Sequence, residues 1–159
     1  MNTQATAQLH LTDLPIGALT LTASNEALTG VEFGRVEHAS LDHVPNDVLL
    51  EAAHQLSEYF AGKRQSFDLP LSPQGTEFQC EVWQALQTIP FGETRSYGEL
   101  ANSLGKPRAA RAVGLANNRN PLAILIPCHR VIGADGALIG YAGGLLIKQA
   151  LLDLESSRS

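Results

Sequence analysis

The spacing of apolar residues changes partway along this chain, and that change restricts the folds open to it. Residues 8 to 34 alternate between apolar and polar side chains, with Gly and Pro at the turns, which predicts a three-stranded antiparallel meander. From Asn46 or Asp47 to Ala61 the apolar positions recur at helical spacing. We expect a helix there and an edge strand over Phe67–Leu71. The first part of the chain is therefore predicted to be an α+β lobe.

A boundary rich in turn-forming residues, Ser72-Pro73-Gln74-Gly75, follows this lobe. A chain of 159 residues is long enough for one good core or for a small lobe joined to a larger one. We predict one compact protein with two domains, residues 1–74 and 75–159.

The second domain reads as mostly helical. Two capping boxes mark the starts of helices: Thr76 with Gln79, and Ser96 with Glu99. In such a box each side chain bonds to the backbone N–H of the other residue, so the helix start needs no outside partner. We expect a short helix after each box.

A third helix is predicted to begin at Pro107, with Arg108 inside it, and to run through Ala116. Together with the helix before it, it forms a plausible helix-turn-helix. Arg108 and Arg111 are three residues apart, so they would share a face. The small side chains beside them would let the backbone approach a DNA groove closely: they are Ala109, Ala110 and Ala112. Such residues favour shape and backbone contacts over base reading, and a surface helix with solvated arginines is the alternative.

Charge is distributed unevenly along the chain. The net charge is -5, yet residues 1–94 carry 3 Lys and Arg against 12 Asp and Glu, whereas residues 95–159 carry 8 against 4. The basic excess surrounds the predicted helix-turn-helix and indicates an anionic partner. The alternative at this point is a basic surface that binds no ligand.

An apolar run over residues 123–126 leads directly into a potentially reactive cysteine, Cys128. We expect the run to be a short buried extended segment that ends where a flexible loop begins. A thiol attacks only as thiolate and needs a proton acceptor or a positive field, and His129 and Arg130 follow at once. A small core cysteine is the alternative for Cys128, and the interpretation favoured for Cys80.

The order of several motifs from Thr76 to Glu155 resembles the O6-alkylguanine-DNA alkyltransferases, also called methylated-DNA–protein-cysteine methyltransferases. The matching segments are Ile89-Pro90-Phe91-Gly92, Ser96-Tyr97, Ala109-Ala110-Arg111-Ala112-Val113-Gly114, Asn120-Pro121, Ile126-Pro127-Cys128-His129-Arg130-Val131, Tyr141-Ala142-Gly143-Gly144, Lys148 and Glu155. The resemblance implies a small N-terminal domain of ribonuclease-H-like type, with antiparallel sheet and helix, before a mostly helical domain with a helix-turn-helix. It also implies DNA repair in which an alkyl group passes irreversibly from O6 of a flipped guanine in double-stranded DNA to the protein's own cysteine.

The resemblance also implies roles for residues around the cysteine. Cys128 would be the alkyl acceptor, His129 would take its proton through an ordered water, and Glu155 would orient the imidazole. Asn120 would fix the turn beside the cysteine, and Tyr97 would press on the rotating phosphate and donate a hydrogen bond to the flipped guanine.

The remaining implied roles concern DNA and the pocket. Arg111 would fill the gap that the base leaves, and Tyr97 and the other residues of the basic helix would contact DNA: these are Arg108, Ala109 and Ala110. Four further residues would line the guanine pocket: Val131, Tyr141, Ala142 and Gly143. Some relatives carry Ser where this chain has Ala142, so a backbone amide would serve as the donor to O6.

Several other expectations are negative. His and Cys residues have no convincing metal-ligand spacing, so we predict no metal and no cofactor. The N-terminal residues Met1–Ala7 show no signal peptide and no spanning segment, so we expect a cytoplasmic protein, as a monomer, with no membrane partner. Three alternatives remain: a damaged-DNA binding relative without transfer, a helix-turn-helix regulator, and a cysteine hydrolase. Cys128 argues against the first, because the binding-only relatives replace the cysteine with Trp. A regulator leaves Cys128 unexplained, and a hydrolase leaves the basic helix unexplained.

Overall fold

The computed structural model describes residues 4–157, and the chain divides into two compact units, Met1–Gln74 and Gly75–Ser159. Residues 1–3, part of the stretch on which the expectation of no signal peptide rests, lie outside the described residues. Within residues 4–157, no helix is both long enough and apolar enough to cross a bilayer.

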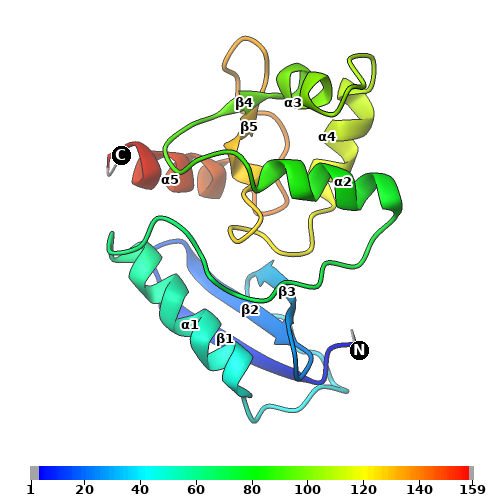
Figure 1. Cartoon of the computed structure of the whole chain (residues 1–159). Coiled ribbons are helices and arrows are strands. Elements are labelled where there is room, and N and C mark those ends of the chain that lie inside the picture. The colour runs from blue at the N-terminus through cyan, green and yellow to red at the C-terminus, as the bar shows by residue number, and fades with distance from the viewer. Residues whose placement is uncertain (1–3, 158–159) are drawn as a thin grey trace. The chain divides into compact units, whose positions relative to one another are not determined.

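The first unit is a three-stranded antiparallel sheet with one helix against it (Figure 1). The strands are β1 (Ala7–Leu14), β2 (Gly17–Ala23) and β3 (Leu28–Phe33), in the order of the predicted meander. Helix α1 (Asp47–Phe60) is capped by Asn46, whose side chain accepts a hydrogen bond from the Leu49 N–H at 3.0 Å. The core of this unit lies between sheet and helix and contains Leu19, Leu21, Leu49 and Leu56, each fully buried.

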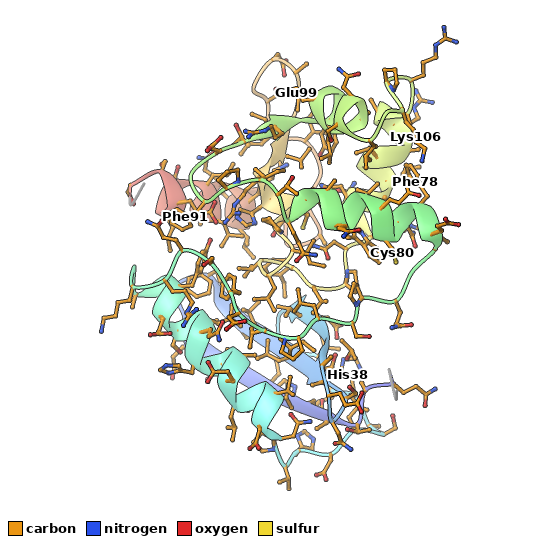
Figure 2. All side chains as sticks on the ribbon, viewed as in Figure 1. His38, Phe78, Cys80, Phe91, Glu99 and Lys106 are labelled. Carbon is orange, nitrogen blue, oxygen red and sulfur yellow. The ribbon has the colours of Figure 1, made fainter. Side chains whose placement is uncertain are left out.

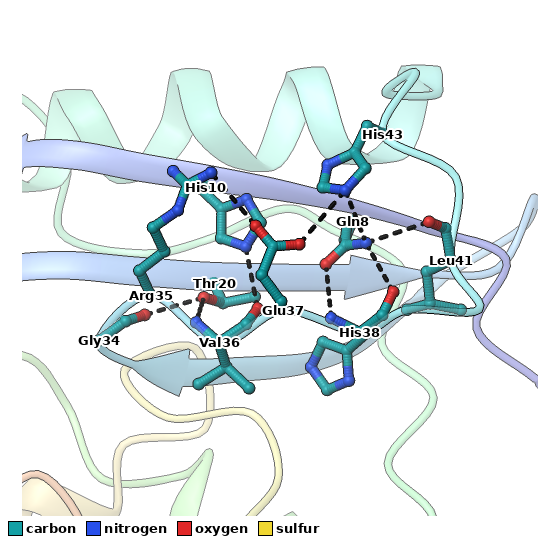
Figure 3. Close-up of polar contacts among 10 residues, drawn as sticks. All are labelled: Gln8, His10, Thr20, Gly34, Arg35, Val36, Glu37, His38, Leu41 and His43. Carbon is teal, nitrogen blue, oxygen red and sulfur yellow. Dashed lines mark hydrogen bonds and ion pairs between the residues drawn. The ribbon is translucent and has the colours of Figure 1, made fainter.

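Two buried polar residues of the sheet hold the long connection that follows β3 (Figure 3). The Gln8 side chain donates to the carbonyls of His38 at 2.8 Å and Leu41 at 3.0 Å. The Thr20 hydroxyl donates to the Gly34 carbonyl and accepts from the Val36 N–H, both at 2.8 Å. Gln8 and Thr20 therefore supply the hydrogen bonds that an irregular segment cannot make to itself.

The predicted edge strand over residues 67–71 is wrong. Only Leu71 makes an isolated bridge, to Leu28, with hydrogen bonds from Leu28 N–H to the Pro70 carbonyl and from Ser72 N–H to the Leu28 carbonyl, both at 2.8 Å. Pro70 has no N–H to donate, so the pairing cannot extend into a ladder.

The second unit packs short helices around a two-stranded parallel ladder. Its elements are α2 (Glu77–Leu86), β4 (Arg95–Ser96), α3 (Tyr97–Ser103), α4 (Ala110–Asn118), a 3₁₀ turn η1 (Cys128–Arg130), β5 (Val131–Ile132) and α5 (Leu145–Ser156). Both predicted capping boxes are present, at Thr76 with Gln79 and at Ser96 with Glu99. The ladder pairs Arg95 with Val131 and Ser96 with Ile132, so it brings the start of α3 beside the end of η1.

The helix-turn-helix is formed by α3 and α4, but its second helix begins later than predicted. Pro107 and Arg108 lie in a turn closed by a hydrogen bond from the Ala109 N–H to the Lys106 carbonyl at 2.9 Å, and α4 begins at Ala110. Proline is also suited to the second position of such a turn, and here that role prevails. Arg108 and Arg111 therefore do not share a helix face.

Candidate active site and basic surface

Cys128 lies at the start of η1, 5% exposed, after a compact buried turn. The segment 123–126 is buried as expected, but the prediction that it is extended is wrong. The Leu125 N–H donates to the Ala123 carbonyl at 2.8 Å, and Ile124 between them has a positive φ of 72°. A β-branched residue in this region is strained, so the surrounding structure must hold it.

Asn120 provides much of that support. Its amide nitrogen donates to the Ile126 carbonyl at 2.7 Å, and its carbonyl oxygen accepts from the Leu122 N–H at 2.9 Å. One side chain thus joins both ends of the turn that leads to Cys128. Without Asn120, the Ile126 carbonyl and the Leu122 N–H would each lose a hydrogen-bond partner. Because the turn is buried, water could not replace that partner.

Behind the cysteine, a carboxylate is shared by an imidazole and a guanidinium. His129 Nε2 lies 2.7 Å from Glu155 Oε2, and Arg130 contacts both carboxylate oxygens, through Nε at 2.8 Å and through its terminal nitrogen at 3.0 Å. Arg130 also donates to the Ile89 carbonyl at 2.6 Å, and its guanidinium lies 5.9 Å from the Phe91 ring centre. His129 and Glu155 are at most 1% exposed. The charges of these buried side chains are therefore stabilised by one another rather than by solvent.

The electrostatics of this group define which atom can accept a proton. Burial raises the pKa of Glu155, but the hydrogen bonds from His129 and Arg130 outweigh it and bring that pKa down to about 2. Burial lowers the pKa of His129, against the opposing effect of Glu155. His129 is therefore neutral at rest, and its bond to the carboxylate assigns the proton to Nε2.

The other ring nitrogen, His129 Nδ1, is then a proton acceptor. It is buried and has no hydrogen-bond partner among residues 4–157. Because buried polar atoms normally have partners, Nδ1 can accept a hydrogen bond from a water molecule.

The surroundings of the thiol shift its pKa in opposite directions. Burial raises the pKa of Cys128, while hydrogen bonding from Asn120 and Tyr141 and the positive charge of Lys148 lower it. At rest the thiol is protonated and must pass its proton to a base before it can attack.

Two buried residues of the site received no role from the sequence. Lys148 is fully buried and donates to the Ile139 carbonyl at 3.0 Å. Asn117 is 1% exposed and donates to the Cys128 carbonyl at 3.3 Å. A signal for Lys148 was its position seven residues before Glu155, on the same face of α5. No sequence signal pointed to Asn117.

Two of the residues expected at the pocket, Tyr97 and Tyr141, interact electrostatically with Cys128. Tyr97 opens α3 and donates from its hydroxyl to the Ile139 carbonyl at 3.2 Å, and Gly114 of α4 faces its ring. Burial, followed by the charge of Cys128, raises the pKa of Tyr97, while its hydrogen bond with Asn117 lowers it. Val131 is buried directly after η1, and Tyr141 lowers the pKa of the thiol. Ala142, which is exposed, and Gly143, which is half-buried, follow in the same loop.

The predicted basic residues lie on the exposed side of the helix-turn-helix. Arg111 is exposed in the first turn of α4, and Arg108 is exposed in the turn before it. Ala109 and Ala110 are half-buried at the helix start. Within residues 4–157, neither arginine forms a salt bridge, so both charges face solvent. In the same range, no three His, Cys, Asp or Glu side chains are grouped so as to hold a metal ion.

Fold and site together define a class: a protein with a helix-turn-helix and a single buried cysteine backed by a histidine–glutamate pair. Two family descriptions match this chain: "6-O-methylguanine DNA methyltransferase, DNA binding domain" over residues 77–157, and the ribonuclease-like domain of the same family over residues 9–73. The chain therefore belongs to the 6-O-methylguanine DNA methyltransferase family.

Individual relatives are similar over nearly the whole chain. A methylated-DNA–protein-cysteine methyltransferase of Methanosarcina acetivorans is 56% identical over 147 residues, covering 90% of this chain and 94% of its own. One of Mycobacterium tuberculosis is 53% identical over 150 residues, covering 92% and 91%. The crystal structure of the M. tuberculosis protein OGT in complex with DNA matches with a TM-score of 0.88 at 49% identity, over 96% of this chain and 94% of that one.

Proposed function

We propose that this chain repairs DNA by moving the alkyl group of an O6-alkylguanine in duplex DNA onto its own Cys128, and that it does so in the cytoplasm. The family and the names of its relatives support the reaction class. One observation carries the assignment of residues: a buried thiol lies beside a neutral imidazole whose other nitrogen is held by a buried carboxylate.

In the proposed reaction, the Cys128 proton passes through a water to His129 Nδ1. Glu155 keeps the Nε2 proton in place and stabilises the imidazolium that forms, which is the logic of a nucleophile, base and orienting carboxylate. The thiolate attacks the alkyl carbon, an S–C bond forms, and the C–O6 bond breaks with its electron pair left on guanine. Guanine then takes up one proton, so the products are a thioether and an ordinary guanine. None of these reaction steps regenerates the thiol.

The damaged base must leave the stack before this reaction can occur. Arg111 is proposed to fill the gap, because it is exposed on α4 with small residues around it. Arg108, Ala109 and Ala110 would contact the DNA backbone at the start of α4. Tyr97 would exchange its bond to the Ile139 carbonyl for one to the flipped guanine.

The flipped base would enter between Tyr97 and the loop that carries Tyr141. Val131 and Gly143 would line this pocket, and the backbone amide of Ala142 would donate to O6, since its side chain has no hydroxyl. Asn120 would keep the thiol aligned through the turn it supports.

A burst experiment tests the proposed function. With duplex DNA carrying O6-methylguanine in large excess, we expect the repaired guanine to equal the protein in amount and then to stop increasing. HPLC of the hydrolysed DNA measures the repaired base over time. Continued turnover would indicate a true catalyst, and no repair despite DNA binding would favour a binding-only relative.

A further inference from the structure

Asn117 is a buried polar residue of the site with no role in the reaction proposed above. It lies in the last turn of α4 and is 1% exposed. Its amide nitrogen donates to the Cys128 carbonyl at 3.3 Å, which distinguishes the nitrogen of the amide from its oxygen. Trp83 Nε1 donates to the carbonyl of the preceding Ala116 at 2.9 Å, so this turn of the helix is anchored. Asn117 is therefore fixed beside the reactive cysteine.

The hydrogen bonds of Asn117 within the fold do not explain why a polar residue is buried here. The Cys128 carbonyl also accepts a hydrogen bond from the Val131 N–H, so it would keep a partner without Asn117. Within residues 4–157, the buried Oδ1 atom of Asn117 has no hydrogen-bond partner. Such an atom costs free energy that a leucine of similar shape would not. Stability alone would favour an apolar residue at this position, so the amide indicates a function.

The side chain that this amide can serve is Tyr97. The capping box of Ser96 and Glu99, the latter labelled in Figure 2, fixes the start of α3, and Tyr97 is the first residue of that helix. Two ring carbons of Tyr97 lie 3.6 and 3.7 Å from the place that a Cβ on Gly114 would occupy. Gly114 is three residues before Asn117, so the two share a face of α4. The Tyr97 ring therefore packs on the face of α4 that carries Asn117.

The electrostatics of Tyr97 agree with this geometry. Burial and the charge of Cys128 raise the pKa of Tyr97, whereas hydrogen bonding with Asn117 lowers it. An N–H that donates to a phenol oxygen has this effect because it stabilises the phenolate. The amide nitrogen carries two N–H groups, and the bond to the Cys128 carbonyl uses one of them. The second can serve the Tyr97 oxygen, whose own proton is donated to the Ile139 carbonyl at rest.

We propose that Asn117 is a positioning residue for proton transfer, which holds the Tyr97 oxygen with its second N–H and stabilises the tyrosinate formed when Tyr97 protonates the departing guanine. In that step the C–O6 bond breaks, its electron pair stays on guanine, and Tyr97 supplies the proton that guanine takes up. Solvent then returns a proton to Tyr97, and the imidazolium of His129 releases the proton that came from Cys128. The negative charge on sulfur disappears as the S–C bond forms, so the charge that opposes ionisation of Tyr97 is lost in the same step. The inference rests on the proposed function, because it assumes that guanine leaves next to Tyr97.

Two substitutions of Asn117 test this role. Asn117→Leu keeps the shape of the side chain and removes both N–H donors, and Asn117→Asp removes the donors while keeping an oxygen. Asn102→Leu is the matched control, since Asn102 is exposed on α3 in the same unit. Reaction with the free base O6-methylguanine measures the chemistry without DNA, and each rate is measured again in a Tyr97→Phe background.

We expect Asn117→Leu and Asn117→Asp to react with the free base about tenfold more slowly than the wild type, and Asn102→Leu to react at the wild-type rate. In the Tyr97→Phe background, Asn117→Leu should cause no further loss, since the two residues act through one proton. Urea unfolding should show that Asn117→Leu is at least as stable as the wild type. Rate losses that multiply in full would overturn the proposal, because they would show that Asn117 acts without Tyr97.

A spectroscopic measurement tests the contact without the reaction. A fluorinated tyrosine at position 97 ionises at lower pH than tyrosine, and its fluorine NMR signal reports that ionisation. We expect the midpoint of this titration to lie at higher pH in Asn117→Leu than in the wild type, because the tyrosinate loses its donor. An unchanged midpoint would overturn the proposal. A raised midpoint in a protein that transfers no methyl group would uphold the contact and refute the proposed function.

Discussion

An Arg111→Ala variant will repair duplex DNA about a hundredfold more slowly than the wild type, while its reaction with the free base O6-methylguanine will be unchanged. Extruding a base costs a few kcal/mol of stacking, and a side chain that fills the gap offsets part of this cost. A hundredfold loss corresponds to ~2.7 kcal/mol at the transition state. Arg111 is suited to this role because it is exposed on α4 and free of salt bridges within residues 4–157.

Rates from single-turnover mixing with either substrate provide the comparison. Arg111→Lys is the control, because it keeps the charge and loses the planar guanidinium; we expect it to lie between the other two. If Arg111→Ala lost the same factor on duplex and on free base, the role in base extrusion would be wrong.

Arg130→Met will lower the free energy of unfolding of the second unit by about 3–5 kcal/mol, the range observed when one partner of a buried ion pair is removed. Glu155 is 1% exposed, so its carboxylate would stay buried with His129 as a remaining partner. The Ile89 carbonyl would lose the donor that now lies at 2.6 Å. The substitution keeps an apolar side chain of similar length, so the effect reports the loss of polar partners.

Urea unfolding followed by tryptophan fluorescence measures this change. Trp83 is the only tryptophan and is 2% exposed in the second unit, so its signal reports on that unit. Arg95→Met is the matched control in the same unit, because Arg95 pairs with Glu93 near the surface and such pairs contribute about 0–1 kcal/mol. Equal effects of the two substitutions would contradict the structural role of Arg130.

Local signals in the sequence predicted much of the fold. The alternation over residues 8–34 and the boxes at Thr76 and Ser96 correspond to the observed meander and helix starts, because these signals depend on nearby residues only. Pro107 is suited both to a helix start and to a turn, and local sequence does not distinguish them. The positive φ of Ile124 is unfavourable for a β-branched side chain, and the turn around this residue maintains it.

The site was predictable only in part for a related reason. The adjacency of Cys128 and His129 indicated a reactive thiol, but Glu155 entered through the family resemblance, since no local pattern joins residues so far apart. Lys148 and Asn117 were missed as contributors because their burial is a property of the packed structure. Polar residues of this kind read as surface residues until their environment is known.

The most direct test of the account is the mass of the protein after incubation with duplex DNA that carries O6-methylguanine. We predict a gain of one methyl group, located by peptide mapping on Cys128, and no gain in a Cys128→Ala variant that still binds the duplex. Cys80, the other free cysteine, provides an internal control and should stay unmodified. An unchanged mass of the wild type, or a methyl group found on any residue other than Cys128, would contradict the account.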